Sequence, residues 1–213
     1  MPMRSGKAGG CFSTSGGLCS WATYILTERV GGTDYGYLGF EVDVSDKLRY
    51  GEDNVIAVKA DTGKPENSRW YTGGGLYRDV DVVITDPGLY FTRHPLYITT
   101  PMAEMDTATV NIQAEVANMA FDTDSLHIRT VIRSPGGKIV HDSTRAHCFN
   151  RRQKIKEYQA DSLVIVNPAR WDCDNPNLYT AELTLYRPDG SVADQAVSRF
   201  GIRKLEYSPE SGD

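Results

Sequence analysis

Alternating hydrophobic and polar residues are the clearest pattern along the chain. In FEVDV, residues 40–44, Phe40, Val42 and Val44 alternate with acidic residues, and NVIAVKAD (54–61) and DVDVVIT (79–85) continue the same kind of pattern. A period of two residues is typical of a strand with one buried face. We find no stretch with a sustained apolar period of about 3.6 residues, the helical period. The pattern therefore predicts an all-β fold.

A second block of strands begins near Leu89. ATVNIQAEVAN (108–118) alternates over four apolar positions, and DSLVIVNP (161–168) is a short apolar strand. Two longer stretches are typical of hairpins because turn residues divide them: SLHIRTVIRSPGGKIVHD (125–142) and LYTAELTLYRPDGSVADQAV (178–197). Roughly seven strands fit between residues 90 and 203, which is the number in an immunoglobulin-like sandwich.

The first block offers fewer strands than a closed fold needs. Residues 23 to 89 contain only about four predicted strands, whereas a jelly roll has about eight. Residues 1–22 are rich in Gly and Ser and predict a poorly ordered leader. Either the leader covers the bare sheet face, or another chain does, or the sequence is a fragment.

Composition narrows the classes of function. The formal net charge of −5 argues against a nucleic-acid partner, which usually meets a basic face. No apolar run reaches the roughly 20 residues of a membrane helix. The basic residues at the start are not followed by the apolar core of a secretory signal. Cys11, Cys19, Cys148 and Cys173 have no metal-binding spacing and are interpreted as free thiols, which is compatible with the cytoplasm.

The stretch ENSRWYTGGGLYRDV, residues 66–80, concentrates the candidate chemistry. Three glycines, 73–75, allow positive φ angles and predict a sharp turn or bulge before the next strand. Arg78 and Asp79 are interpreted as a structural ion pair. Trp70 offers a flat apolar face suited to the C–H face of a sugar, and Asn67 and Arg69 supply hydrogen-bonding groups for vicinal hydroxyls.

The same stretch resembles the signature of glycoside hydrolase family 2, the β-galactosidase and β-glucuronidase family. The match includes Asn67, Arg69, Trp70, Tyr71, Gly73, Gly75, Tyr77, Arg78, Asp79 and Val80. Three more segments resemble the family in the same order: YGYLGFEVDVSDKLRYGEDNVIAVKAD, ARWDCDNPNLYTAEL and SRFGIRKLEY. Together the matches extend from Val30 to Arg203, and the leader matches nothing.

The resemblance implies a domain order. In the family a jelly-roll sugar-binding domain precedes an immunoglobulin-like sandwich, and a catalytic (β/α)₈ barrel comes third. We therefore expect residues 1–22 to be an unassigned leader and residues 23–89 to be the C-terminal part of a jelly-roll sugar-binding domain. Residues 90–203 would form an immunoglobulin-like β-sandwich domain. Residues 204–213 would be a tail leading to an absent catalytic barrel.

Family members are retaining glycosidases, which need two carboxyl groups about 5–5.5 Å apart. The resemblance places both catalytic glutamates in the barrel, which needs about 250 residues, and ten residues follow Arg203. We therefore assign no catalytic residue, and Glu66 is not taken as one. The expected function is that of a non-catalytic N-terminal fragment of a β-galactosidase-like hydrolase whose complete form hydrolyses O-glycosidic bonds. Whether the chain is an enzyme by itself stays open, with inactivity expected.

The resemblance also implies a sugar subsite. By position, Asn67, Arg69 and Trp70 are the candidate substrate-binding residues, and we predict no metal and no cofactor there. Carbohydrate is the expected partner, bound weakly because an enclosing pocket is lacking. The alternatives are a stand-alone carbohydrate-binding module and a protein-interaction module that pairs through an open sheet edge, including a homo-oligomer.

Other polar clusters receive structural interpretations. His141, His147 and Cys148 lack the spacing of a metal site and predict a surface loop. DCDN, residues 172–175, predicts a turn rather than a calcium site. RRQKIK, residues 151–156, predicts a solvated strand edge. Trp171 is predicted to lie in the core of the second sandwich.

Overall fold

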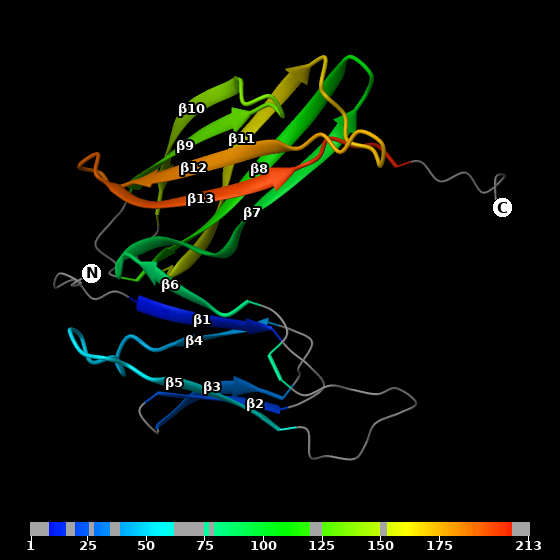
Figure 1. Cartoon of the computed structure of the whole chain (residues 1–213). Helices are drawn as coiled ribbons and strands as arrows, with labels where there is room; N and C mark the ends of the chain where they lie inside the picture. Colours follow the sequence, from blue (N-terminus) through cyan, green and yellow to red (C-terminus); the bar gives the residue numbers. More distant parts are fainter. Residues whose placement is uncertain are drawn as a thin grey trace. The chain divides into compact units, whose positions relative to one another are not determined.

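The computed structural model describes residues 9–15, 20–25, 28–34, 39–61, 75–76, 79–119, 125–149 and 153–205. The chain divides into two compact units, unit 1 (Met1–Pro87) and unit 2 (Gly88–Asp213). Each unit consists of β-strands arranged in two sheets (Figure 1). The all-β fold predicted from the alternation is therefore confirmed. Within the described residues, no helix is long and apolar enough to cross a membrane.

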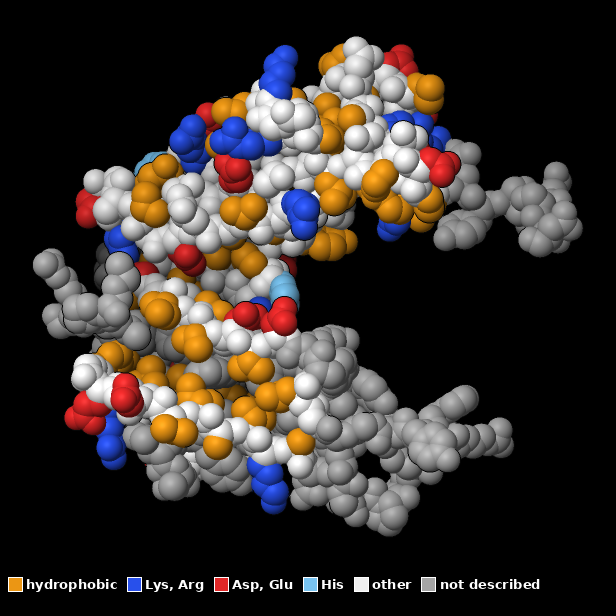
Figure 2. Space-filling view, viewed as in Figure 1, with side chains coloured by type: hydrophobic (Ala, Val, Ile, Leu, Met, Phe, Trp, Pro, Cys, Tyr) orange, Lys and Arg blue, Asp and Glu red, His pale blue; other side chains and the backbone are white. Residues whose placement is uncertain are grey.

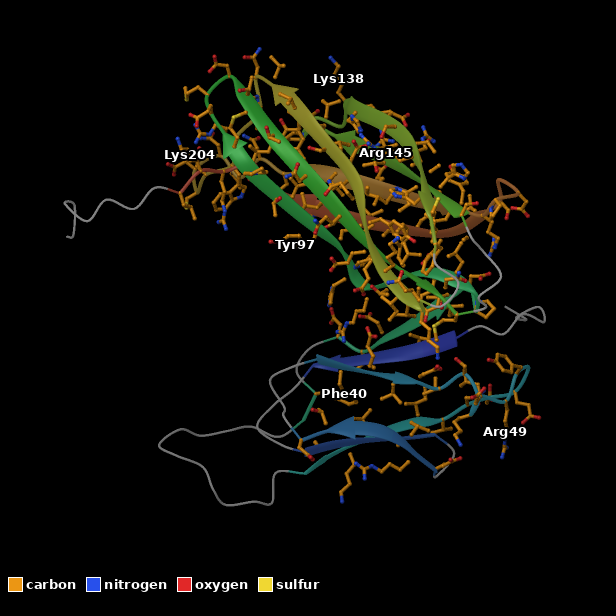
Figure 3. All side chains as sticks on the ribbon, turned by 180° about the vertical axis from the view of Figure 1, so that it is seen from behind. Phe40, Arg49, Tyr97, Lys138, Arg145 and Lys204 are labelled. Atoms are coloured by element: carbon orange, nitrogen blue, oxygen red, sulfur yellow. The ribbon has the colours of Figure 1, made fainter. Side chains whose placement is uncertain are left out.

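Unit 1 contains two three-stranded antiparallel sheets, with strand orders β4-β1-β6 and β3-β2-β5. Val42 and Val44 are buried, and Phe40 packs against them between the sheets (Figure 3). The strands are β1 (Gly9–Ser15), β2 (Ser20–Ile25), β3 (Glu28–Thr33), β4 (Gly39–Asp43), β5 (Ile56–Asp61) and β6 (Asp81–Thr85). The three strands predicted from alternation in this region, β4, β5 and β6, are all present.

The prediction of a poorly ordered leader over residues 1–22 is wrong where the structure describes that segment. β1 and β2 are strands, and each is the middle strand of its sheet. A Gly- and Ser-rich segment shows little hydrophobic alternation. Strand pairing nevertheless depends on backbone N–H and C=O groups, which these residues supply as well as any others. Pairing with a strand on each side therefore stabilises β1 and β2 as strands, although their side chains show no clear hydrophobic alternation.

Unit 2 is a sandwich of seven strands in the described part of the chain. A four-stranded sheet, β10-β9-β12-β13, faces a three-stranded sheet, β11-β8-β7 (Figure 1). The strands are β7 (Leu89–Ala103), β8 (Thr107–Asn118), β9 (Ser125–Arg133), β10 (Ile139–Cys148), β11 (Ile155–Val166), β12 (Tyr179–Tyr186) and β13 (Val192–Phe200). All neighbouring strands are antiparallel. This is the immunoglobulin-like sandwich that the strand number predicted.

Alternate residues of the central strands form the core of unit 2. Ile112 on β8, Ile128 on β9 and Leu183 on β12 are at most 1% exposed. Fully burying one such side chain stabilises the fold by about 1.5–3 kcal/mol. The strands of the core therefore hold the edge strands, and the polar residues described below, in fixed positions.

Both predicted hairpins are confirmed. β9 and β10 are joined through a turn in which Gly137 has a φ of 82° and its N–H donates to Ser134 O at 2.8 Å. β12 and β13 are joined in the same way, with Gly190 at a φ of 83° and its N–H donating to Arg187 O at 3.0 Å. Glycine is needed because positive φ is unfavourable for residues with a Cβ.

Candidate functional site

The three residues predicted to bind sugar, Asn67, Arg69 and Trp70, lie outside the described residues, as does the Arg78 partner of the predicted ion pair with Asp79. The prediction about them stays a prediction. Of the three glycines that follow, Gly75 is described, and its φ of 129° is the positive value expected for a turn before β6.

Two of the sequence segments that resemble family 2 come together at one end of unit 2. The indole ring of Trp171 packs against Gly201, where an added Cβ would lie 2.8 Å from the Trp171 Cβ. The backbone N–H of Trp171 donates to Ile202 O at 2.8 Å, and the Arg203 guanidinium carbon lies 5.5 Å from the centroid of the indole ring. A guanidinium at this distance is attracted by the negative face of the ring. The segment that contains Trp171 and the segment from Gly201 to Arg203 therefore hold each other in place.

Trp171 is not a core residue, so that prediction is wrong. The side chain is half-buried and lines a hollow of about 350 Å³ together with Ile98, Leu178 and Phe200. The core predicted to surround it is filled by strand residues such as Tyr179, which is 2% exposed and stacks on Phe200 with ring centroids 5.6 Å apart. A large aromatic ring on a connecting segment, outside the strands, closes the end of the sandwich instead of entering it.

The turn predicted for DCDN is confirmed. Asp172 Oδ1 accepts the backbone N–H of Asp174 at 2.9 Å and that of Asn175 at 2.6 Å. A carboxylate that binds the backbone two and three residues further along makes an Asx-type turn. Asp172 thereby shapes the chain between Trp171 and β12.

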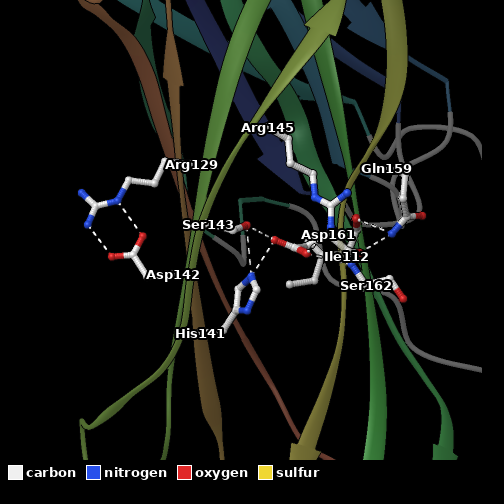
Figure 4. Close-up of polar contacts among 9 residues, drawn as sticks. All are labelled: Ile112, Arg129, His141, Asp142, Ser143, Arg145, Gln159, Asp161 and Ser162. Carbon is white, nitrogen blue, oxygen red and sulfur yellow. Dashed lines mark hydrogen bonds and ion pairs between the residues drawn. The ribbon is translucent and has the colours of Figure 1, made fainter.

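A buried carboxylate that the sequence interpretation missed, Asp161 of β11, lies between the two sheets (Figure 4). Its side chain is 0% exposed. The register between β11 and β8 shifts between Gln159 and Asp161, so that both Ala160 and Asp161 face inward. Without this bulge the alternation would turn one of these two residues outward.

Side chains of β10, the edge strand of the opposite sheet, surround this carboxylate. His141 Nε2 lies 2.6 Å from Asp161 Oδ2, and the Ser143 hydroxyl donates to the same oxygen. Arg145 donates to Oδ1 at 3.2 Å, as does the backbone N–H of Ser162 at 3.0 Å. The two edge strands are thus joined by hydrogen bonds to one buried anion, and we call this group the Asp161 clamp.

The clamp keeps Asp161 ionised. Burial raises the pKa of a carboxyl group because it disfavours the charged form. In Asp161 the hydrogen bonds from Ser143 and His141, with the charges of His141 and Arg145, outweigh burial, and the pKa of Asp161 lies below its usual value. The group is therefore an anion that β10 stabilises.

A serine, a histidine and an aspartate in contact do not make a nucleophilic triad here. In such a triad one ring nitrogen takes the serine proton while the other donates to the carboxylate. His141 Nε2 instead lies 3.1 Å from Ser143 Oγ and also contacts Asp161, and Ser143 donates its own proton to Asp161. The arrangement can hold two sheets together but cannot activate the hydroxyl.

The loop predicted for His141, His147 and Cys148 is wrong, because all three lie on strand β10. The His147 ring packs edge-on against Tyr158, with centroids 4.8 Å apart, and burial is the main reason that its pKa is lowered. Cys148 and Cys173 are free and exposed thiols. Among the residues with described positions, no group of three or more His, Cys, Asp or Glu side chains could hold a metal ion.

The basic run RRQKIK is described only from Gln153 onward. Its last two residues begin β11, and Ile155 is exposed, which fits the edge position of β11 in its sheet. Lys156 Nζ lies 5.0 Å from the centroid of the Tyr158 ring and donates to Cys148 O at 3.2 Å.

Comparisons with known proteins agree with this architecture. A family model described as glycosyl hydrolases family 2 matches residues 94–203, which lie in the seven-stranded sandwich and the segment after it. This match covers just over half of the chain. The chain therefore belongs to glycosyl hydrolase family 2, as its sequence segments predicted.

Relatives and solved structures extend the likeness to both units. The chain is 27% identical over 189 residues to the β-galactosidase BoGH2A of Bacteroides ovatus, covering 89% of this chain and 22% of that protein. It is 26% identical over 205 residues to a β-glucuronidase of Bacteroides fragilis, covering 89% of this chain and 28% of that protein. A solved family 2 member from Bacteroides cellulosilyticus matches with a TM-score of 0.88 at 30% identity.

The structural match covers almost all of this chain but a smaller share of the solved one. It covers 97% of this chain, so it includes part of residues 1–22, which resembled no family segment. It covers 28% of the solved chain, and the present chain spans 17% to 28% of the length of three curated relatives.

Proposed function

We propose that this chain provides non-catalytic β-sandwich units of a family 2 glycosidase of the β-galactosidase type, whose complete form hydrolyses O-glycosidic bonds in carbohydrates. The match to the Bacteroides cellulosilyticus family 2 structure carries this proposal, because it takes in almost all of this chain and 28% of the solved one. The β-galactosidase and β-glucuronidase names of the relatives support the reaction class.

Three of the described carboxyl groups do not fit the general-acid role of a glycosidase. A retaining glycosidase uses one carboxyl group with a raised pKa as the general acid. The described carboxyl groups with shifted pKa values, Asp142, Asp161 and Asp189, all shift downward because hydrogen bonds stabilise their anions. Such groups are poorly suited to donate a proton to a leaving group.

A hydrolysis assay tests the non-catalytic part of the proposal. The purified 213-residue chain would be incubated with nitrophenyl β-galactoside and nitrophenyl β-glucuronide, and release of nitrophenol followed by absorbance. We expect no release above the rate without protein. Steady turnover that co-purifies with the chain would overturn the proposal.

The sugar-binding part of the proposal concerns Asn67, Arg69 and Trp70. Trp70 would stack on a sugar ring, and Asn67 and Arg69 would hydrogen-bond its hydroxyls. We expect weak binding of methyl β-galactoside that Trp70→Ala abolishes, measured by calorimetry at millimolar sugar. Tyr50→Ala, which changes a tyrosine that is 48% exposed, is the control and should leave binding unchanged. Equal binding by wild type and Trp70→Ala would exclude this site.

A second candidate function is self-association through β6. β6 is an edge strand of its sheet, and Val82, Val83 and Ile84 are 58%, 41% and 58% exposed. Hydrophobic side chains also gather on the face of unit 1 that Figure 2 presents. Exposed apolar edges can pair with the same edge of a second copy. Light scattering would then give a dimer that Val82→Lys converts to a monomer; a monomeric wild type would exclude this function.

A further inference from the structure

The outer face of the three-stranded sheet in unit 2 contains a hollow of about 280 Å³. Its floor is β8, where Gln113 and Glu115 point outward because their neighbours Ala114 and Val116 are buried. Glu157 of β11 lies directly opposite Glu115 in the strand register. Three hydrogen-bonding side chains therefore face the same side of the sheet.

The second component of the hollow is an exposed aromatic ring. Tyr97 of β7 pairs with Gln113 of β8, and its side chain is 65% exposed, projecting from the sheet (Figure 3). A tyrosine ring in this position presents a flat apolar surface beside hydrogen-bonding groups. That combination suits a ligand with one apolar face and polar groups on its rim.

An irregular segment of β7 forms one wall. In the pairing of β7 with β8, Phe91 is opposite Val116 and Leu96 is opposite Ala114, so residues 92–95 all lie opposite Glu115. Within this segment His94 has a φ of 50°, which is uncommon for a residue with a Cβ. The bulge lifts Arg93, His94 and Pro95 from the sheet and makes a hollow out of a flat face.

The charges in the hollow indicate what it would accept. Like charges directly opposite each other destabilise an antiparallel pair, so Glu115 and Glu157 gain from groups that donate hydrogen bonds to them. Glu115 already accepts the Thr92 hydroxyl at 2.5 Å, and Glu157 is exposed. Arg93 in the wall is the one cation set against these two anions, so the net charge of the described lining stays negative when His94 is neutral. Ligand hydroxyls could donate to both carboxylates, whereas an added carboxylate would meet this net negative charge.

We propose that this hollow binds a neutral pyranose ring, stacked on Tyr97 with its hydroxyls donating to Glu115 and Glu157. The volume is close to the lower end for ligand pockets, about 300 Å³, which suits one ring rather than an oligosaccharide. The described residues that line the hollow all belong to unit 2, and the proposal does not require Asn67, Arg69 or Trp70. The chain would then contact carbohydrate at a second point, outside the predicted subsite of unit 1.

Amide chemical shifts of the 213-residue chain test the proposal. Titration with methyl β-galactoside should shift the amides of Tyr97, Gln113 and Glu157 along one saturable curve with a millimolar dissociation constant. Tyr97→Ala should weaken this binding at least about fivefold, because stacking is lost. Tyr97→Phe should retain most of it. Tyr50→Ala, an exposed tyrosine of unit 1, is the matched control and should not change it.

A second sugar and a second variant ensure that every outcome either supports or overturns the proposal. Methyl β-glucuronide should bind at least about fivefold more weakly than the galactoside, because its carboxylate meets two anions, Glu115 and Glu157, against one cation, Arg93. Glu157→Gln, an exposed and nearly isosteric change, should reduce that difference even if Tyr97→Ala fails to fold. Equal affinity for both sugars, or amides of this hollow that do not move at saturating sugar, would overturn the proposal. Shifts confined to residues 67–70 would overturn it while supporting the site in unit 1.

Discussion

An aspartate bridges the two sheets of unit 2 on each of its open sides, and the two bridges differ in burial. On the β10–β11 side, Asp161 is fully buried and contacts His141, Ser143 and Arg145. On the β7–β13 side, half-buried Asp194 accepts the Phe91 N–H at 2.9 Å. Both residues join strands of different sheets.

The comparison shows that bridging the two sheets does not by itself determine how much a residue contributes to the free energy of unfolding. A buried carboxylate has lost its water and depends on its partners, so removing them leaves a charge without compensation. A half-buried carboxylate keeps some water, and its main contribution is to satisfy one backbone donor. The first bridge should therefore be sensitive to changes in its neighbours and the second should not.

The largest effect should come from removing two partners of Asp161 together. We expect His141→Ala with Ser143→Ala to lower the free energy of unfolding of unit 2 by about 3–5 kcal/mol at pH 7, because a buried anion loses hydrogen bonds. Urea unfolding of the full chain, followed through amide signals of β8 and β12, measures this. Thr144→Ala, an exposed change on the same strand, is the control. A loss no larger than that of the control would show that water reaches Asp161.

The next effect concerns pH. The folded-state pKa of Asp161 is below its unfolded value of about 3.9, so the stability it contributes is present above that pH and is lost as pH falls through the folded pKa. Asp161→Asn should be about 1–3 kcal/mol less stable than wild type at pH 7. This difference should shrink below about pH 4. Unfolding curves from pH 7 to about pH 3 give the comparison, and a difference independent of pH would contradict it.

A smaller effect is expected on the other side of the sandwich. Asp194→Ala should cost about 1 kcal/mol, because the Phe91 N–H loses its acceptor. The same urea titration measures the change, with Val197→Ala, a residue that is 67% exposed on the same strand, as the control. A loss as large as that of the His141 and Ser143 double variant would mean that burial does not separate the two bridges.

The smallest effect should come from an ion pair beside the clamp. Arg129 donates to Asp142 at 2.9 and 2.7 Å, but both side chains are about two-fifths exposed. Exposed pairs contribute little because both charges remain hydrated and are screened by salt. Asp142→Asn should leave the unfolding curve unchanged within error. A measurable loss would show that this pair belongs to the clamp.

Strands with regular alternation could be predicted from the sequence. Every second residue of β8 from Ala108 to Val116 is buried, as the pattern required. The hairpin turns were also predictable, because Gly137 and Gly190 occupy positions where positive φ is needed. These features depend on local patterns, which a sequence displays directly.

Features that depend on irregular pairing could not be predicted. Asp161 faces inward only because a bulge interrupts β11, and a bulge leaves no clear hydrophobic signature. β7 contains two register shifts and Pro95, which hide its alternation, so the hollow beside Tyr97 was missed as well. An Asp next to Ala160 within an apolar strand was the only available signal for the clamp.

The contact between Gly201 and Trp171 has a consequence for how such chains can diverge. Because the space for a Cβ at position 201 is already filled by the Trp171 side chain, a residue larger than glycine fits there only if Trp171 moves or is replaced. A larger residue at position 201 would require a smaller one at position 171, and the guanidinium of Arg203 would then lose its aromatic partner. A substitution at position 201 therefore affects the packing of Trp171, which lies thirty positions earlier in the sequence, and through it the position of Arg203.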